Sequence, residues 1–215
     1  MHMSTGLQKS LSFRDALDHI EQILLSRPGI GLVSISGITC SGKTYLARTL
    51  ERDLDALDLD TTVIHLDDFF RSHNDPDIPK DAHGHPIFDM HSSFHTDEFI
   101  SAVSALACGR AASIPRYDLS RNERMPGTTV RAEDAVIAEG LFANSFLKRA
   151  SLEAIAVYVE TPLDVCLARR IERDVKRWNV SPDKVIEAWR RKVLPYLNLQ
   201  RDPEKECADI IVTHS

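Results

Sequence analysis

Short runs of apolar residues alternate along the chain with longer segments in which apolar residues recur every three or four positions. A short apolar run is typical of a buried strand, and the longer spacing is typical of an amphipathic helix. The runs that predict strands are GLVSIS, TTVIHL, DAVIAEG, AIAVYVE and ADIIV. Helices are predicted over residues 12–27, 43–57 and 96–108, and from the pairs Thr161-Pro162 and Ser181-Pro182. This alternation predicts an α/β fold, a parallel sheet with helices on both faces.

Two segments depart from this alternation. The polar segment Arg71–His91 is too long for a simple connection, and loops of this length usually carry function or lack order. Farther on, ASIPRYDL and TTVRA predict two short strands joined by SRNERMPG, a hairpin flap at about residues 113–132. No internal repeat or interdomain linker interrupts the sequence, so we expect a single domain over residues 1–215.

The composition is that of an ordinary soluble protein, with 43% hydrophobic and 27% charged residues. A formal net charge of -6 disfavours nucleic acid and anionic membranes as partners. No apolar run approaches the roughly 20 residues that span a bilayer. The first residues, MHMSTGLQKSLSF, lack the apolar stretch of a secretory signal. We therefore expect a cytoplasmic protein that binds neither nucleic acid nor membrane, and we leave a homo-oligomer open.

The cysteines and histidines form no complete disulfide or metal pattern. The four cysteines lie far apart without a CxxC pair, which indicates reduced thiols. Several histidines lie between residues 73 and 95, where the HGH sequence or the pair His91 and His95 could ligate zinc. Because no acidic or cysteine partner completes a ligand set at the expected spacing, we favour a polar loop around a substrate pocket.

The sequence GITCSGKT, directly after the run GLVSIS, contains a glycine, four residues and then Gly-Lys-Thr. Glycines at this spacing let backbone N–H groups turn toward phosphates, and the start of the following helix adds a positive field. Lys43 is expected to reach the β- and γ-phosphates, and Thr44 to ligate Mg²⁺. The preceding strand and following helix favour this interpretation over a structural glycine turn. The residues predicted to bind ATP are Gly37, Thr39, Cys40, Ser41, Gly42, Lys43, Thr44 and Tyr45.

Signatures of several nucleotide-hydrolysing classes are missing from the sequence. It contains no Asn-Lys-x-Asp motif, with which GTPases recognise guanine, and no LSGGQ-type motif of transport ATPases. The strand AVIAEG ends in one acid, whereas an AAA-type ATPase would end it in Asp-Glu. That acid, Glu139, is placed to contact Mg²⁺ directly or through water. The alternative is a residue that starts a helix.

A kinase also needs a carboxylate to activate the acceptor hydroxyl and positive charge around the transferred phosphoryl group. HLDDFF supplies Asp67 and Asp68 at the carboxyl end of a predicted strand, where open α/β sheets bind ligands. The alternative is a pair of solvated loop acids. Arg170, Arg173 and Arg177 share one helix face and predict a lid at about residues 169–182. The alternative here is a surface with local ion pairs to Glu172 and Asp174.

Together these parts resemble the uridine kinase and phosphoribulokinase superfamily of P-loop kinases, over about residues 32–212. IPRYDLSRNERMPGTTV, LARRIERDV and ADIIV look like uridine/cytidine kinase patterns, and ISGITCSGKT and HLDDFF are similar to those of nicotinamide riboside kinases. The resemblance implies a P-loop fold, ATP as donor and Mg²⁺ as metal. The sequence departs from uridine kinases at Asn122, where they carry a base-reading histidine, and at Trp178, where they carry a lid arginine.

The resemblance also implies roles for matching residues. Asp67 is implied as the base that takes the proton of a 5′-hydroxyl, Asp89 as the ligand of ribose hydroxyls, and Tyr117 as the aromatic residue beside the nucleobase. The predicted catalytic residues are Asp67, Lys43 and Arg173. The predicted metal ligands are Thr44 and Glu139. The predicted acceptor-binding residues are Asp67, Phe70, Asp89, Tyr117, Asn122, Arg124 and Arg170.

We therefore expect an ATP- and Mg²⁺-dependent kinase that phosphorylates a primary hydroxyl of a small molecule, in particular the 5′-hydroxyl of a ribonucleoside. Two alternatives stay open. One is a kinase of the same fold for another acceptor, such as nicotinamide riboside, a sugar or a pantothenate-like molecule. The other is a nucleotide-dependent switch or ATPase without an acceptor, which has no need for the set of Asp67, Asp89, Tyr117 and Arg124.

Overall fold

In the computed structural model, which describes residues 8–213, one six-stranded parallel sheet has the strand order β1-β8-β7-β2-β6-β3. Every residue of β2 and β6 is buried, which explains why these central strands read as continuous apolar runs. The predicted parallel sheet is confirmed. Its strands are β1 (Lys9–Ser12), β2 (Gly31–Ser36), β3 (Thr61–His65), β6 (Ala135–Gly140), β7 (Ile155–Glu160) and β8 (Ile210–Thr213).

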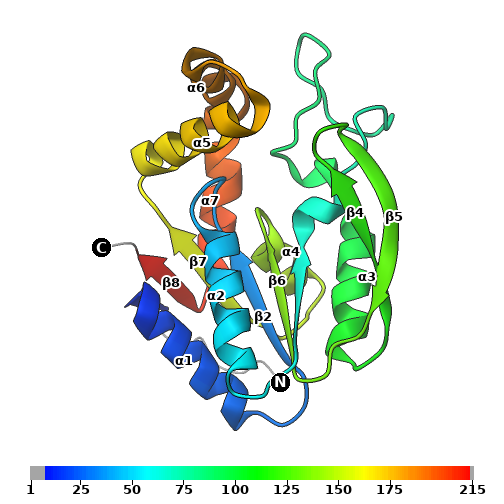
Figure 1. Cartoon of the computed structure of the whole chain (residues 1–215), viewed down its shortest axis with the longest axis vertical. Helices are drawn as coiled ribbons and strands as arrows, with labels where there is room; N and C mark the ends of the chain where they lie inside the picture. Colours follow the sequence, from blue (N-terminus) through cyan, green and yellow to red (C-terminus); the bar gives the residue numbers. More distant parts are fainter. Residues whose placement is uncertain (1–7, 214–215) are drawn as a thin grey trace.

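Helices cover both faces of the sheet, as predicted (Figure 1). On one face lie α1 (Phe13–Ser26) and α2 (Lys43–Asp55), whose apolar sides include the fully buried Leu17 and Leu50. Ser12 is the N-cap of α1, and its Oγ accepts a hydrogen bond from the amide of Asp15. On the other face lie α3 (Thr96–Ala107) and α4 (Ala143–Arg149), packed around a cluster of phenylalanines.

A separate antiparallel hairpin, β4 (Ala112–Asp118) and β5 (Glu123–Val130), lies beside α3 (Figure 1). The predicted hairpin is confirmed, but its second strand begins at Glu123 rather than near residue 128. The reason is that residues assigned to the connection pair with β4, for example Met125 with Arg116. The turn is therefore only four residues long, Leu119 to Asn122.

Three further helices follow β7. The first two stand beyond the carboxyl ends of the strands, opposite the long loop after β3, and the third runs from them back toward β8 (Figure 1). They are α5 (Leu163–Trp178), α6 (Pro182–Lys192) and α7 (Leu197–Glu206), with a 3-10 turn at Leu194–Tyr196. Short 3-10 turns at Leu66–Phe69, called η1, and His91–Ser93 bracket the long loop. The helix predicted from the Thr161-Pro162 pair is confirmed, and its N-cap is Pro162.

Three elements have no counterpart in the sequence prediction. β1 has four residues, none fully buried, so no apolar run marks it, and it forms by pairing with β8. α4 has only seven residues. α7 buries the polar residues Gln200 and Glu204 and contains Pro203, so it lacks the apolar spacing of an amphipathic helix. Within residues 8–213, no helix combines the length and apolarity that crossing a membrane requires.

Candidate active site

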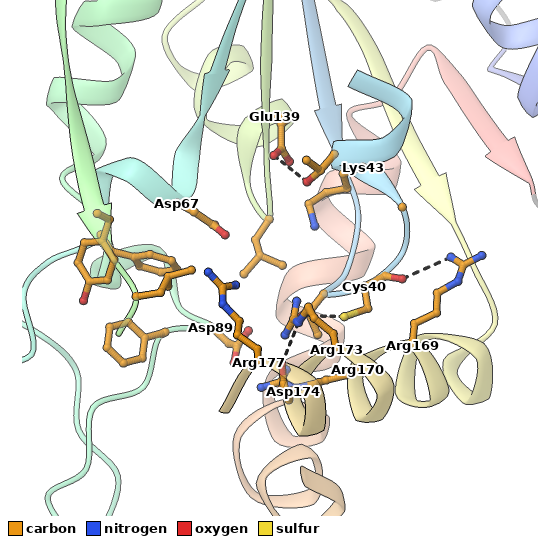
Figure 2. Close-up of a pocket in the computed structure, with 18 of the residues that line it drawn as sticks. Cys40, Lys43, Asp67, Asp89, Glu139, Arg169, Arg170, Arg173, Asp174 and Arg177 are labelled. Atoms are coloured by element: carbon orange, nitrogen blue, oxygen red, sulfur yellow. Dashed lines mark hydrogen bonds and ion pairs between the residues drawn. The ribbon is translucent and has the colours of Figure 1, made fainter. Parts of the chain in front are cut away.

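A cavity of about 800 Å³ lies at the carboxyl ends of the sheet strands, and α5 and the β4–β5 hairpin contribute to its walls (Figure 2). The loop after β2 and η1 after β3 form other walls. The fold brings most of the predicted donor and acceptor residues together here. The predicted residues that line the cavity are Thr39, Cys40, Gly42, Lys43, Thr44, Tyr45, Asp67, Phe70, Asp89, Tyr117, Asn122, Glu139, Arg170 and Arg173.

The loop between β2 and α2 turns tightly at two glycines. Gly42, the N-cap of α2, has a φ of 107°, which residues with side chains rarely adopt. A Cβ atom on Gly37 would lie 2.6 Å from Ser41 Oγ, so no larger residue has room there. Thr161 and Arg169 each donate a hydrogen bond to the carbonyl of Ser41, at 2.8 and 3.2 Å. The end of β7 and the start of the α5 arginine series thereby fix the loop.

The side chains of this loop fit a phosphate group. The Lys43 ammonium donates to the backbone carbonyl of Ile38 at 3.2 Å and lines the cavity. The first turn of the 13-residue helix α2 adds unpaired N–H groups and a positive field. A triphosphate would supply acceptors for these donors.

Glu139, the acid near the end of β6, receives two hydrogen bonds on the same oxygen. Thr44 Oγ1 lies 2.9 Å from Glu139 Oε1, and His65 Nδ1 lies 2.7 Å from it. Burial alone would raise the pKa of Glu139, but the His65 hydrogen bond and the charge of Lys43 hold that pKa below its ordinary value. The carboxylate is therefore ionised at neutral pH. A carboxylate beside a hydroxyl provides the oxygen ligands that Mg²⁺ prefers.

Asp67 lies in η1 and points toward the same space as Lys43 (Figure 2). Its side chain is exposed, but only to the open cavity that it lines. The protein walls around the cavity desolvate the carboxyl, and with the nearby charge of Glu139 this raises the pKa of Asp67 to about 6, although Lys43 acts in the opposite direction. The neighbouring Asp68 does not line the cavity, and its Oδ1 accepts a hydrogen bond from the amide of Tyr117 at 3.1 Å.

Aromatic rings form one wall of the cavity, which we call the aromatic wall: Phe70, Phe88 and Tyr117. The centroids of the Phe88 and Tyr117 rings lie 5.3 and 5.4 Å from that of Phe70. Phe70 itself stacks on the fully buried Phe94, with centroids 4.3 Å apart. The wall is therefore anchored to the core and presents flat apolar surfaces to the cavity.

Asp89 lines the cavity from the long loop after β3. Burial raises the pKa of its carboxyl, against the opposing charges of Arg170 and Lys43. Gln200 on α7 donates its Nε2 hydrogen to the backbone carbonyl of Asp89 at 3.1 Å. A residue of the C-terminal helices thus positions the loop that carries Asp89.

The arginines of α5 line the cavity opposite the aromatic wall. Arg170 and Arg173 both pair with Asp174, at 3.3 and 2.8 Å, so of the local ion pairs considered from the sequence those to Asp174 occur. Both still face the cavity. Arg177 has its guanidinium 5.0 Å from the ring centroid of Trp178 and, within residues 8–213, no carboxylate partner. The series therefore supplies positive charge next to the glycine loop and Asp67 (Figure 2).

Three predicted residues do not reach the cavity. Gly37 and Ser41 lie behind the surface of the glycine loop. Arg124 forms a two-pronged ion pair with Glu98 of α3, outside the cavity. The histidines of the long loop also lie outside the cavity lining. The residues that this loop contributes to the lining are Phe88 and Asp89.

Sequence reasoning missed several residues of the site. Phe88, Leu119 and Leu141 contribute apolar surface to the lining, and none of them was predicted, although Leu119 lies within the pattern IPRYDLSRNERMPGTTV. His65 was missed as well, although the signal existed. β3 and β6 are neighbours in the sheet, and their register places His65 directly beside Glu139. Gln200 had no detectable signal, because its contact depends on how α7 packs.

Comparisons with known proteins agree with this geometry. The sequence model of the Phosphoribulokinase / Uridine kinase family matches residues 32–215. The uridine kinase of Proteus mirabilis is 32% identical over 184 residues, which cover 84% of this chain and 85% of the relative. The uridine kinase of Escherichia coli strain K12 is 31% identical over 187 residues, with the same coverage of 84% and 85%.

Two solved structures share the fold. A protein of Silicibacter sp. TM1040, whose proposed activity is that of a fructose transport system kinase, has a TM-score of 0.73 and 19% identity, covering 94% of this chain and 98% of its own. D-glycerate 3-kinase from Cryptococcus neoformans has a TM-score of 0.60 and 16% identity, covering 89% of both chains. By its sequence and its fold, the chain belongs to the phosphoribulokinase and uridine kinase family of ATP-dependent kinases.

Proposed function

We propose that this kinase transfers the γ-phosphoryl group of ATP to the 5′-hydroxyl of a ribonucleoside. The observation that carries the proposal is that Lys43 of the glycine loop and Asp67 face one cavity, whose other wall is aromatic. A phosphate held at the loop and a planar base held at the aromatic wall would place the acceptor hydroxyl near Asp67. The resemblance to bacterial uridine kinases supports a nucleoside as the acceptor.

The donor side rests on residues that touch phosphate or metal. The amides of the glycine loop and Lys43 orient the triphosphate, and Thr44 and Glu139 would hold Mg²⁺. Bound there, Mg²⁺ would neutralise charge on the phosphate oxygens. Tyr45 lines the same side of the cavity and has a largely exposed side chain, so it is available to the nucleotide.

On the acceptor side, Asp67 accepts the proton of the attacking hydroxyl. With a pKa of about 6 it is ionised at neutral pH, yet it binds a proton more readily than an ordinary aspartate. Asp89 would accept hydrogen bonds from ribose hydroxyls, and the aromatic wall would hold the base. Arg170 and Arg173 would neutralise charge on the transferred group, with residues 169–182 closing as a lid.

A second candidate is the same reaction on another small acceptor, such as nicotinamide riboside, a sugar or a pantothenate-like molecule. The observation in its favour is Asn122, which lines the cavity where uridine kinases carry a histidine. Its amide can still donate and accept hydrogen bonds, but it does not match the histidine with which uridine kinases bind the pyrimidine. The Arg124 side chain pairs with Glu98 and does not line the cavity, so Asn122 is the residue of this pair that can contact the base.

The test is a panel of acceptors incubated with the enzyme, Mg²⁺ and ATP and scored by ADP release. The panel contains uridine, cytidine, adenosine, nicotinamide riboside, fructose and pantothenate. We expect a nucleoside to give the highest kcat/KM, with phosphate recovered on the 5′-oxygen. Preference for nicotinamide riboside, fructose or pantothenate over uridine, cytidine and adenosine would replace the first proposal by the second. ATP hydrolysis that no acceptor stimulates would contradict both and favour a switch or ATPase.

A further inference from the structure

His65, the last residue of β3, makes a contact that the site described so far does not use. In the parallel pairing of β3 with β6 it stands directly beside Glu139. Its Nδ1 lies 2.7 Å from Glu139 Oε1, the oxygen that also accepts from Thr44 at 2.9 Å. Both hydrogen bonds fall on one oxygen of the carboxylate, and within residues 8–213 the other oxygen, Oε2, accepts none.

The chemistry of the pair fixes the direction of the hydrogen bond. Glu139 is ionised and can only accept, so His65 must carry its hydrogen on Nδ1 and donate it. This holds whether the imidazole is neutral or charged. His65 does not belong to the cavity lining, so the ring is not placed to touch a substrate. Its influence on the reaction can therefore pass only through its contact with Glu139 and through its charge, which acts to lower the pKa of Asp67.

The two donors restrict how the Glu139 side chain can rotate. With Oε1 held by Thr44 and His65, the plane of the carboxylate is set by its neighbours rather than by solvent. Under the proposed function the Thr44 hydroxyl also serves the metal. His65 is then the partner of Glu139 that has no other polar contact among the described residues, and it is held in place by the backbone pairing of two central strands.

We propose that His65 is a positioning residue for Glu139 and fixes the free oxygen, Oε2, toward the metal. This inference rests on the proposed role of Glu139 as a ligand of Mg²⁺. It predicts that His65 acts on how strongly Mg²⁺ tightens nucleotide binding, and not on how the acceptor binds. Residues that orient a metal ligand typically change metal affinity or activity by about 10- to 100-fold when they are lost.

Two substitutions separate the hydrogen bond from the bulk of the ring. His65→Leu removes the donor and keeps an apolar side chain. His65→Asn keeps an N–H donor at the same number of bonds from Cβ as Nδ1, so it can restore the contact to Glu139. The matched control is His95→Leu, which removes a partly buried histidine outside the cavity lining. Circular dichroism and thermal unfolding would verify that each variant is folded.

The readout is ADP affinity measured by isothermal titration calorimetry, once with excess Mg²⁺ and once with EDTA. The ratio of the two Kd values gives the gain due to Mg²⁺. We expect His65→Leu to lower this gain by about 10-fold or more. ADP affinity in EDTA should change little. His65→Asn should recover most of the gain, and His95→Leu should match the wild type. Steady-state kinetics should show an unchanged KM for the acceptor.

The outcomes distinguish the inference from the function on which it rests. If wild-type enzyme shows no gain with Mg²⁺, the assignment of Glu139 and Thr44 to the metal fails. If the wild type shows the gain and folded His65→Leu keeps it in full, the positioning role of His65 is wrong while the metal site stands. Equal losses of ADP affinity with and without Mg²⁺, or no recovery in His65→Asn, would reduce His65 to a packing residue.

Discussion

The raised pKa of Asp67 makes a prediction about how the reaction depends on pH. With a pKa of about 6, roughly one tenth of this carboxyl is ionised at pH 5 and roughly nine tenths at pH 7. An ordinary aspartate, with a pKa near 3.9, would be about nine tenths ionised even at pH 5. If ionised Asp67 is the base, kcat/KM should be near its maximum at pH 7 and should fall about tenfold between pH 7 and pH 5, in proportion to the ionised fraction of Asp67.

The assay is kcat/KM measured from pH 5 to pH 8 with excess Mg²⁺ and both substrates below KM, so that the profile reports the free enzyme. Asp67→Asn should lower kcat by about 100-fold or more, as expected for a lost general base. The part of the acidic decline that is due to Asp67 should vanish in the residual activity of this variant. Protonation of ATP itself would persist in the variant, so the difference between the two profiles isolates Asp67.

Asp68→Asn is the matched control, because Asp68 lies one residue away but does not line the cavity. The asparagine can still accept the hydrogen bond from the amide of Tyr117. We expect this variant to keep both the rate and the acidic decline. A wild-type profile that stays flat down to pH 5 would refute the perturbed pKa. Near-normal kcat in Asp67→Asn would refute the base assignment altogether.

Three other predictions concern the glycine loop, the lid and the core. Gly37→Ala should weaken ADP binding in calorimetry, since its methyl group would overlap Ser41 Oγ; unchanged affinity would mean that the loop yields easily. Arg173→Ala should lower kcat by about 100-fold or more with little change in ADP affinity, and a change in affinity alone would contradict its charge-neutralising role. Asn144→Ala should cost about 1–3 kcal/mol, because it breaks buried hydrogen bonds to Ser34 and the Val157 carbonyl. Differential scanning calorimetry should then show Tm lowered by about 2–4 °C per kcal/mol, whereas an unchanged Tm would show that the network contributes nothing.

The sheet and the donor side of the site could be predicted from sequence because their signals are local. Buried strands read as apolar runs, and the glycine loop needs its glycines and Lys43 at one fixed spacing. Asp67 and Glu139 were also predictable, since ligands gather where parallel strands end. In each case the residues that matter lie within a few positions of the pattern that reveals them.

The remaining parts depend on contacts between distant segments. β1 exists because β8 offers it hydrogen-bond partners, and nothing in KSLS predicts a strand. Arg124 matched a motif, yet its side chain turned to Glu98, whose position is set by the packing of α3. Gln200 reaches the Asp89 loop only because α7 folds back past it. Such contacts follow from tertiary packing, which a single sequence does not display.

The pairing of β1 with β8 also bears on the order in which the protein is made. The strands lie about 200 residues apart in the chain, so the ribosome releases β8 long after β1. During synthesis β1 must wait without its hydrogen-bond partner, while β2, β6 and β3 can already associate. A pause in translation before β8 would therefore expose an unpaired edge of the growing sheet, and nascent chains halted there should be the ones that most need chaperones.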